Sequence, residues 1–155
     1  MYAWLVALHL VGFVVFLVCH AVSMWVAFRI RGEPDRAVIA ALLGMSARGN
    51  QAMYLGLILL GIGGLGAASI AGWLTAPWVI ASYAVLAVTL VAMWAMGAGF
   101  YYPLRDGLEG TDKTPRLDDD ALRATIAGSR RPEALAAIGL TSLLILVLLM
   151  VLKPG

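Results

Sequence analysis

The fold of this chain is decided by residues 3–28, AWLVALHLVGFVVFLVCHAVSMWVAF, a run without any Asp, Glu, Lys or Arg. Three more runs of this kind follow, at residues 52–74, 78–100 and 134–152. A helix of about 20 apolar residues crosses the roughly 30 Å hydrocarbon layer of a bilayer. Its backbone must be helical, because lipid offers no partner for an open N–H or C=O. The sequence therefore predicts an all-α polytopic membrane protein, a four-transmembrane-helix bundle that forms one membrane domain over residues 1–155.

The composition supports this class and excludes others. The chain is 62% hydrophobic and 13% charged, whereas a soluble domain carries about 25% charged residues. The chain has no basic stripe with interleaved aromatics, so nothing in it indicates nucleic-acid binding. The single Cys19 cannot form an intramolecular disulfide. Motifs of hydrolases, P-loop proteins and zinc proteases are absent. Whether the chain is an enzyme stays open.

Basic residues in the short loops predict the orientation. The loops after the first and third runs hold ten of the eleven Lys and Arg residues, and residues 75–77 hold none. The ten are Arg29, Arg31, Arg36, Arg48, Arg105, Lys113, Arg116, Arg123, Arg130 and Arg131. Because the basic side stays in the cytoplasm, we expect a multi-pass protein of the bacterial cytoplasmic (inner) membrane with both termini outside.

Both basic loops also contain helical patterns. Pro34 and Asp35 open a pattern that is either a short cytoplasmic interfacial helix or an N-terminal extension of the second span. The three aspartates at residues 118–120 suit a helix N-terminus, where negative charge meets the helix dipole. This helix should end near Gly128, and Pro132 fits the first turn of the fourth span.

Small residues are concentrated in the second span, and they allow helix backbones to approach closely in lipid. Two interpretations stay open: packing within the bundle, or a face for a homodimer or a larger membrane complex. The candidate face consists of Gly61, Gly63, Gly64, Ala67 and Ala68.

The two histidines, His9 and His20, are the main functional candidates, because ionisable residues within a span are uncommon and tend to face the bundle interior. They are eleven residues apart, which at about 100° per residue brings both imidazoles to one helix face, roughly 16 Å apart along the axis. The residues that share or border this face are Phe13, Phe16, Ser23 and Met24. This is our candidate binding site, and His9 and His20 are the candidate metal ligands.

Three interpretations of this face compete. The imidazoles lock helix packing, or they bind haem b or another porphyrin, or they bind a metal such as copper. Further copper ligands would come from Cys19, Met24, Met93 or Met96. A haem held by two histidines cannot form within one chain, because both lie on one helix. His–Met ligation, a single protein ligand or a dimer interface would be required. We rank copper below a porphyrin, and the absence of any cofactor stays open.

A resemblance covers nearly the whole chain. Its motifs are LHLVG at residues 8–12, CHAVSM at 19–24, FRIR at 28–31 and LMVLKP at 149–154. With these the chain resembles an uncharacterised family of small four-helix bacterial membrane proteins. That family is similar to the membrane domain of copper-resistance protein D and to the bacterial four-helix protoporphyrinogen oxidase of haem synthesis.

The resemblance implies a link to haem, porphyrin or copper, and it matches His9 to a histidine early in the first span of both groups. The chain departs from the oxidase type, which uses a lysine within the third or fourth span, because Lys153 stands at the end of the last run. It also lacks a soluble copper-binding domain. Our leading hypothesis is a bundle associated with haem, porphyrin or a metal. The alternative is a non-catalytic accessory or scaffold subunit of a membrane complex whose histidines are structural.

Overall fold

The computed structural model describes residues 1–154, and it is all-helical. The elements are α1 (Tyr2–Arg29), the 3-10 turn η1 (Ile30–Gly32), α2 (Arg36–Ile70), α3 (Pro77–Glu109), α4 (Asp119–Gly128) and α5 (Arg131–Leu152). Four of the helices are long and apolar enough to cross a membrane. The prediction of an all-α protein with four such helices is confirmed.

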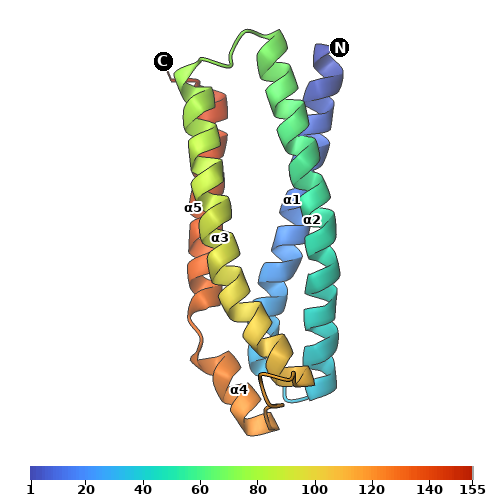
Figure 1. The fold of residues 1–155 in the computed structure, drawn as a ribbon. Helices are drawn as coiled ribbons and strands as arrows, with labels where there is room; N and C mark the ends of the chain where they lie inside the picture. The colour runs from blue at the N-terminus through green and yellow to red at the C-terminus, as the bar shows by residue number, and fades with distance from the viewer. Residues whose placement is uncertain (155) are drawn as a thin grey trace.

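The long helices form two pairs that lie side by side (Figure 1). Helix α1 packs along α2, and α3 packs along α5. Both described ends of the chain lie at one end of the molecule, together with the turn between α2 and α3 (Figure 1). The opposite end holds η1, α4 and the start of α2, and we call it the charged end.

Helix α2 begins at Arg36 rather than at residue 52, so the pattern opened by Pro34 and Asp35 is an extension of the second long helix and not a separate interfacial helix. The Asp35 carboxylate caps this helix by accepting a hydrogen bond from the Ala37 backbone N–H at 2.7 Å. The short helix predicted after residue 118 is present as α4 and ends at Gly128 as expected.

Helix α3 continues to Glu109, past the apolar run that ends at residue 100. It contains Pro103, which removes one backbone hydrogen bond of the helix. Gly107 lies within α3, where a Cβ would stand 2.7 Å from the Leu117 side chain. The backbone N–H of Leu117 also donates to the Gly107 carbonyl at 2.9 Å. The following loop therefore packs back on the helix, and a Cβ at residue 107 would force the Leu117 side chain to move.

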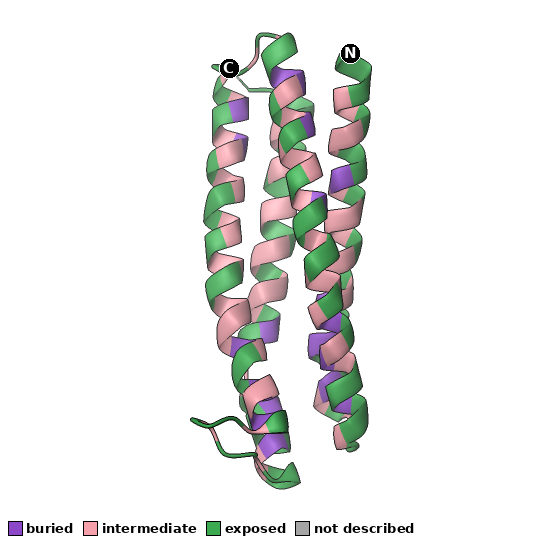
Figure 2. Cartoon of the chain, turned by 45° about the vertical axis from the view of Figure 1, so that its right-hand side comes forward, coloured by how far each residue is buried: buried purple, intermediate pink, exposed green. Residues whose placement is uncertain are grey.

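The hydrophobic core lies at the charged end, where five of the six elements meet. Its buried members are Val26, Ala27, Ile30, Ile39, Leu43, Phe100, Leu104, Leu108, Leu122 and Ile126. Burying a Leu or Ile side chain stabilises a fold by about 1.5–3 kcal/mol. Figure 2 shows that exposed residues recur along the whole length of the long helices. The core therefore joins the two helix pairs at one end.

Helices α1 and α2 are held together by a backbone contact between small residues. A Cβ on Gly12 would lie 2.3 Å from the Leu60 backbone nitrogen, and a Cβ on Gly63 would lie 2.5 Å from the His9 backbone nitrogen. No side chain larger than hydrogen fits at either position without moving the helices apart. Gly61 differs, because a Cβ there would meet nothing within 4 Å. Packing within the chain thus uses Gly63, and the homodimer face remains a prediction.

Candidate cofactor site

His9 is fixed by its neighbours on α2. Its Nδ1 atom lies 2.8 Å from the Leu60 carbonyl oxygen. Because a carbonyl only accepts, Nδ1 carries the hydrogen of this bond. The ring covers Gly64, where a Cβ would lie 2.8 Å from Nδ1 and 3.5 Å from the Tyr83 hydroxyl of α3. His9 therefore acts in helix packing.

His20 has different surroundings. Its ring stacks on Phe16, with centroids 6.0 Å apart and an interplanar angle of 4°. Its Nε2 atom lies 3.1 Å from the position of a Cβ on Gly139 of α5, and the Met93 sulfur of α3 lies 3.7 Å from the same position. Within residues 1–154 no hydrogen bond to the His20 ring is found. Three helices therefore bring an imidazole, a thioether and a glycine together.

This donor set suits a soft metal ion or a haem iron. Imidazole nitrogen and methionine sulfur bind copper, and together they form one of the axial ligand pairs of haem. The described residues contain no group of three or more His, Cys, Asp or Glu that could hold a metal ion. A bare ion at His20 and Met93 would therefore have few protein ligands. A porphyrin brings four nitrogens of its own, so one or two protein ligands complete its iron.

The side chains on this face of α1 are not fully enclosed. His9, Phe13, Phe16 and His20 are all half-buried, although they lie in the middle of a helix that faces the rest of the bundle. The core that joins the two helix pairs lies nearer the charged end. The residues expected to line a binding site thus keep part of their surface accessible.

Ser23 takes part in a polar network that joins three helices. It is 9% exposed. Its hydroxyl accepts a hydrogen bond from Ser46 at 3.1 Å and donates to Asn50 at 3.4 Å. The Tyr101 hydroxyl donates to the Ser23 carbonyl oxygen at 2.6 Å. Ser23 therefore packs α1 against α2 and α3. Met24, which borders the predicted histidine face, is half-buried.

Sequence reasoning missed Gly139, and it named Met93 only as one of several copper ligands. The signal for Gly139 was present, since it is a single glycine among large apolar residues of the run 134–152. Its significance depends on His20, which is more than a hundred residues away in the chain. No local pattern connects the two.

At the charged end, Arg31 forms a two-point ion pair with Glu133, in which NH2 donates to Oε2 at 2.8 Å and NH1 contacts Oε1. Glu133 stands just before the apolar run 134–152. The Arg31 hydrogen bond lowers the pKa of the Glu133 carboxyl from its ordinary value. Planar, two-point pairs of this kind fix geometry as well as charge. The pair ties η1, which follows α1, to the start of α5.

At the opposite end, the Lys153 ammonium lies 4.4 Å from the centroid of the Trp73 ring and 5.7 Å from that of Trp78. Tyr2 packs edge-on against Trp73 with centroids 6.5 Å apart. A cation above aromatic faces is attracted by the ring quadrupole. This contact joins the end of α5 to the turn between α2 and α3.

No family model, no curated protein and no solved structure matches this chain.

Proposed function

We propose that this chain is a multi-pass protein of the bacterial cytoplasmic membrane that binds haem b or another porphyrin within its bundle, with His20 as the protein ligand. The proposal is carried by the position of the His20 imidazole. Its Nε2 atom, from α1, and the Met93 sulfur, from α3, approach the same point beside Gly139 of α5. The resemblance of the first span to membrane proteins of haem synthesis and copper resistance agrees with this ligand class.

The surface of the long helices supports membrane insertion. Large apolar side chains point outward from the long helices, with Val88 71%, Trp94 67% and Leu144 60% exposed. Water would penalise so much apolar surface, whereas lipid would solvate it. The positive-inside rule puts the charged end in the cytoplasm and both termini outside.

A porphyrin fits the donor set better than a bare copper ion. His20 and Met93 would offer a haem iron an imidazole nitrogen and a thioether sulfur. Copper would need further ligands, and Cys19, the neighbour of His20 in sequence, points about 100° away on the helix. When bound, a haem of this kind would supply a one-electron iron couple.

The chain's own residues would bind and orient that group. Stacking on Phe16 fixes the plane of the His20 ring. Gly139 leaves open the volume beside Nε2 that a larger residue would fill. His9 keeps α1 and α2 in register through its hydrogen bond to the Leu60 carbonyl.

A second candidate is a non-catalytic accessory or scaffold subunit of a membrane complex. The hydrogen bond of His9 to Leu60 favours it, because that contact needs no ligand. Docking of a partner or of a second copy would use the small-residue face of α2. On that face Gly61 has open space around it, whereas Ala67 and Ala68 are already buried.

The deciding experiment is the absorption spectrum of the full chain, purified in mild detergent from haem-replete cells. We expect a Soret band and about one haem per chain by pyridine haemochrome assay. His20→Ala should abolish the band, and Met93→Leu should shift it. The matched control Met96→Leu, on the same helix, should leave it unchanged. A colourless, metal-free preparation that copurifies with another membrane protein overturns the proposal in favour of the scaffold function.

Insertion and orientation have a separate test that does not depend on any cofactor. The chain should stay in the membrane pellet after alkaline carbonate extraction. A Thr111→Cys variant in a Cys19→Ala background should resist an impermeant thiol reagent in intact cells and react after the cells are broken. Labelling of Cys at this position in intact cells would reverse the proposed orientation.

A further inference from the structure

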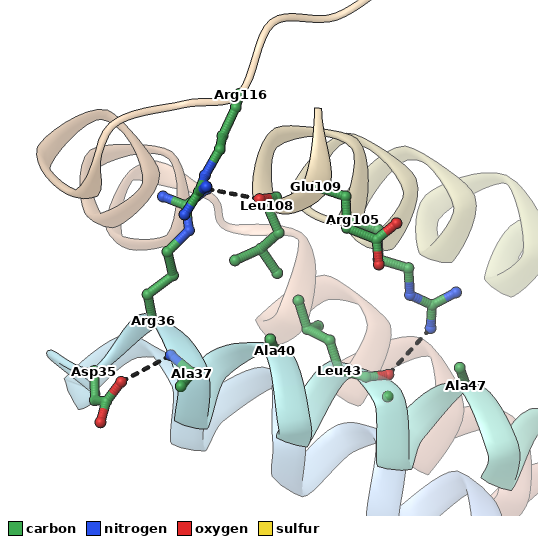
Figure 3. A pocket seen from close by; sticks show the side chains of 11 residues that line it. Asp35, Arg36, Ala37, Ala40, Leu43, Ala47, Arg105, Leu108, Glu109 and Arg116 are labelled. Carbon is green, nitrogen blue, oxygen red and sulfur yellow. Dashed lines mark hydrogen bonds between the residues drawn. The ribbon is translucent and has the colours of Figure 1, made fainter. Parts of the chain in front are cut away.

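An open pocket of about 800 Å³ lies at the charged end, between the start of α2 and the end of α3. Figure 3 shows that its walls come from both helices and from the loop that follows α3. It is lined by Asp35, Arg36, Ala37, Ala40, Leu43, Gly44, Ala47, Arg105, Leu108, Glu109 and Arg116. It is separate from the His20 region, because none of the residues beside His20 lines it.

Arg36 lines this pocket, and four of its five N–H donors are already bonded within the described chain. It donates to the carbonyl oxygens of Leu117 at 2.8 Å, Gly107 at 3.1 Å and Leu108 at 2.8 Å. It also pairs with the Asp119 carboxylate at 3.1 Å. The NH1 and NH2 donors of Arg36 therefore hold the end of α3 and the following loop onto α2, and its charge is offset by a carboxylate.

Arg105 and Arg116 retain donors. Arg105 makes one long hydrogen bond, to the Leu43 carbonyl at 3.3 Å, and both guanidinium groups line the pocket (Figure 3). Within residues 1–154 neither forms an ion pair. Arg48 adds positive charge nearby, since its NH2 atom lies 3.9 Å from the position of a Cβ on Gly44. Guanidinium groups with free N–H donors bind phosphate oxygens in two-point fashion.

Two acids also line the pocket, and they differ in availability. The Asp35 carboxylate is used in capping α2, where it accepts from the Ala37 N–H at 2.7 Å. Glu109 makes no ion pair within residues 1–154 and is exposed. It would compete with an anion for Arg105, which stands one turn before it on α3. Removing Glu109 should therefore strengthen anion binding.

Small side chains extend the pocket along α2. Ala37, Ala40, Gly44 and Ala47 recur every three or four residues, so they lie on one face of the helix. This face leads from the arginines toward the apolar run 52–74. It offers a shallow apolar surface along which an acyl chain can lie. A soluble phosphate compound has no acyl chain to place there.

We propose that this pocket binds the phosphate headgroup of an anionic phospholipid, with Arg105 and Arg116 on the phosphate oxygens and an acyl chain along the small-residue face of α2. Basic pockets between membrane helices on the cytoplasmic side hold anionic headgroups in this way. The inference rests on the membrane insertion proposed above, and it is independent of any porphyrin.

The test uses the full chain reconstituted in nanodiscs and a fluorescent, short-chain phosphatidylglycerol as probe, with the matching phosphatidylcholine as the neutral control. We expect preferential retention of phosphatidylglycerol. Arg105→Gln and Arg116→Gln should each weaken it about fivefold, and Glu109→Gln should strengthen it. The control pair Arg123→Gln and Arg130→Gln, exposed at the same end of the molecule, should change retention little.

Several outcomes would overturn the proposal. Equal retention of the two lipids would do so, and so would unchanged retention in Arg116→Gln. Displacement of the probe by millimolar inorganic phosphate would identify a site for soluble phosphate compounds instead. Arg116→Gln carries the test if Arg105→Gln fails to fold, because no hydrogen bond from Arg116 holds the described chain together. Carbonate extraction and the absorption spectrum of the same samples separate this result from a failure of insertion or of porphyrin binding.

Discussion

The Nδ1 atom of His9 lies 2.8 Å from the carbonyl oxygen of Leu60, and this contact separates the two histidines of α1 by role. They share a helix face, yet His9 is bonded to the neighbouring helix while His20 faces Met93 and Gly139 without a hydrogen bond within residues 1–154. We therefore assign helix packing to His9 and propose the ligand role for His20.

Replacement of His9 should lower stability and spare cofactor binding. His9→Ala removes a hydrogen bond between α1 and α2, which contributes about 1 kcal/mol in a typical case. We expect a lower unfolding temperature in detergent and an unchanged Soret band. His9→Asn should recover part of the loss, because its amide can donate to the Leu60 carbonyl. Loss of the band in His9→Ala without any loss of stability would assign the ligand role to His9 instead.

The glycine contact between α1 and α2 should tolerate no methyl group. Gly12→Ala would bring its Cβ to 2.3 Å from the Leu60 nitrogen, so the helices must separate at a cost of about 1–3 kcal/mol. The matched control is Gly61→Ala, which meets nothing within 4 Å and should stabilise α2 by up to about 1 kcal/mol through helix propensity. Thermal unfolding of both variants measures the difference. A size change in Gly61→Ala by gel filtration would support the predicted homodimer face.

Features of the fold that depend on local sequence could be predicted, and features that depend on contacts between distant residues could not. Four long helices were predictable, because lipid requires about 20 apolar residues and a helical backbone in each span. The start of α2 at Arg36 was not determined by hydropathy. The Asp35 cap marks this start locally, and Pro34 and Asp35 had left it open as one of two alternatives. The hydrogen bonds of Arg36 to the carbonyls of Gly107 and Leu108, which are distant in sequence, could not be predicted. The end of α3 beyond residue 100 likewise depends on the Leu117 contact with Gly107.

For the candidate site, helical periodicity predicted that His9 and His20 share a face. They were functional candidates because ionisable residues are uncommon within a span. What each imidazole touches could not be predicted. The partners Leu60 and Gly139 belong to other helices and are ordinary residues of apolar runs. Only the arrangement of the helices in space distinguishes a packing histidine from one that is free to bind.

Gly139 should be required for the cofactor and dispensable for the fold. A Cβ there would stand 3.1 Å from the His20 Nε2 atom, so Gly139→Ala should reduce haem occupancy while helix content and unfolding temperature of the ligand-free chain are maintained. Gly97→Ala is the matched control, since a Cβ at Gly97 meets nothing within 4 Å. Equal occupancy in both variants would argue against binding beside His20.

The Arg31–Glu133 pair predicts a pH dependence of stability. The pKa of Glu133 is lowered from its ordinary value of 4.5 in the folded chain, chiefly by the hydrogen bond from Arg31. A group with a depressed folded pKa stabilises the fold above its unfolded pKa, and this contribution is lost as the pH falls through the folded pKa. The unfolding temperatures of the wild type and Glu133→Gln should therefore differ at neutral pH and converge as the pH falls through the lowered pKa of Glu133.

A double-mutant cycle checks the cause of that pH dependence. Arg31→Gln should remove at least as much stability as Glu133→Gln, because Arg31 also donates to the Ser129 carbonyl. The double variant should lose little more than Arg31→Gln alone. Asp112→Asn, in the exposed loop after α3, is the control and should shift the unfolding temperature little. Additive losses in the double variant would mean that the two side chains act separately.

Lys153 should hold the end of α5 to the turn between α2 and α3 through the Trp73 ring, 4.4 Å away. Contacts of this type contribute about 0.5–2 kcal/mol, depending on how far they are desolvated. Lys153→Gln should lower the unfolding temperature and change the tryptophan fluorescence, and Lys153→Arg should preserve both, because arginine also binds aromatic faces. The control Lys113→Gln changes the same charge in an exposed loop at the other end of the molecule. If Lys153→Gln and Lys113→Gln behave alike, the effect is one of net charge and the contact with Trp73 contributes nothing.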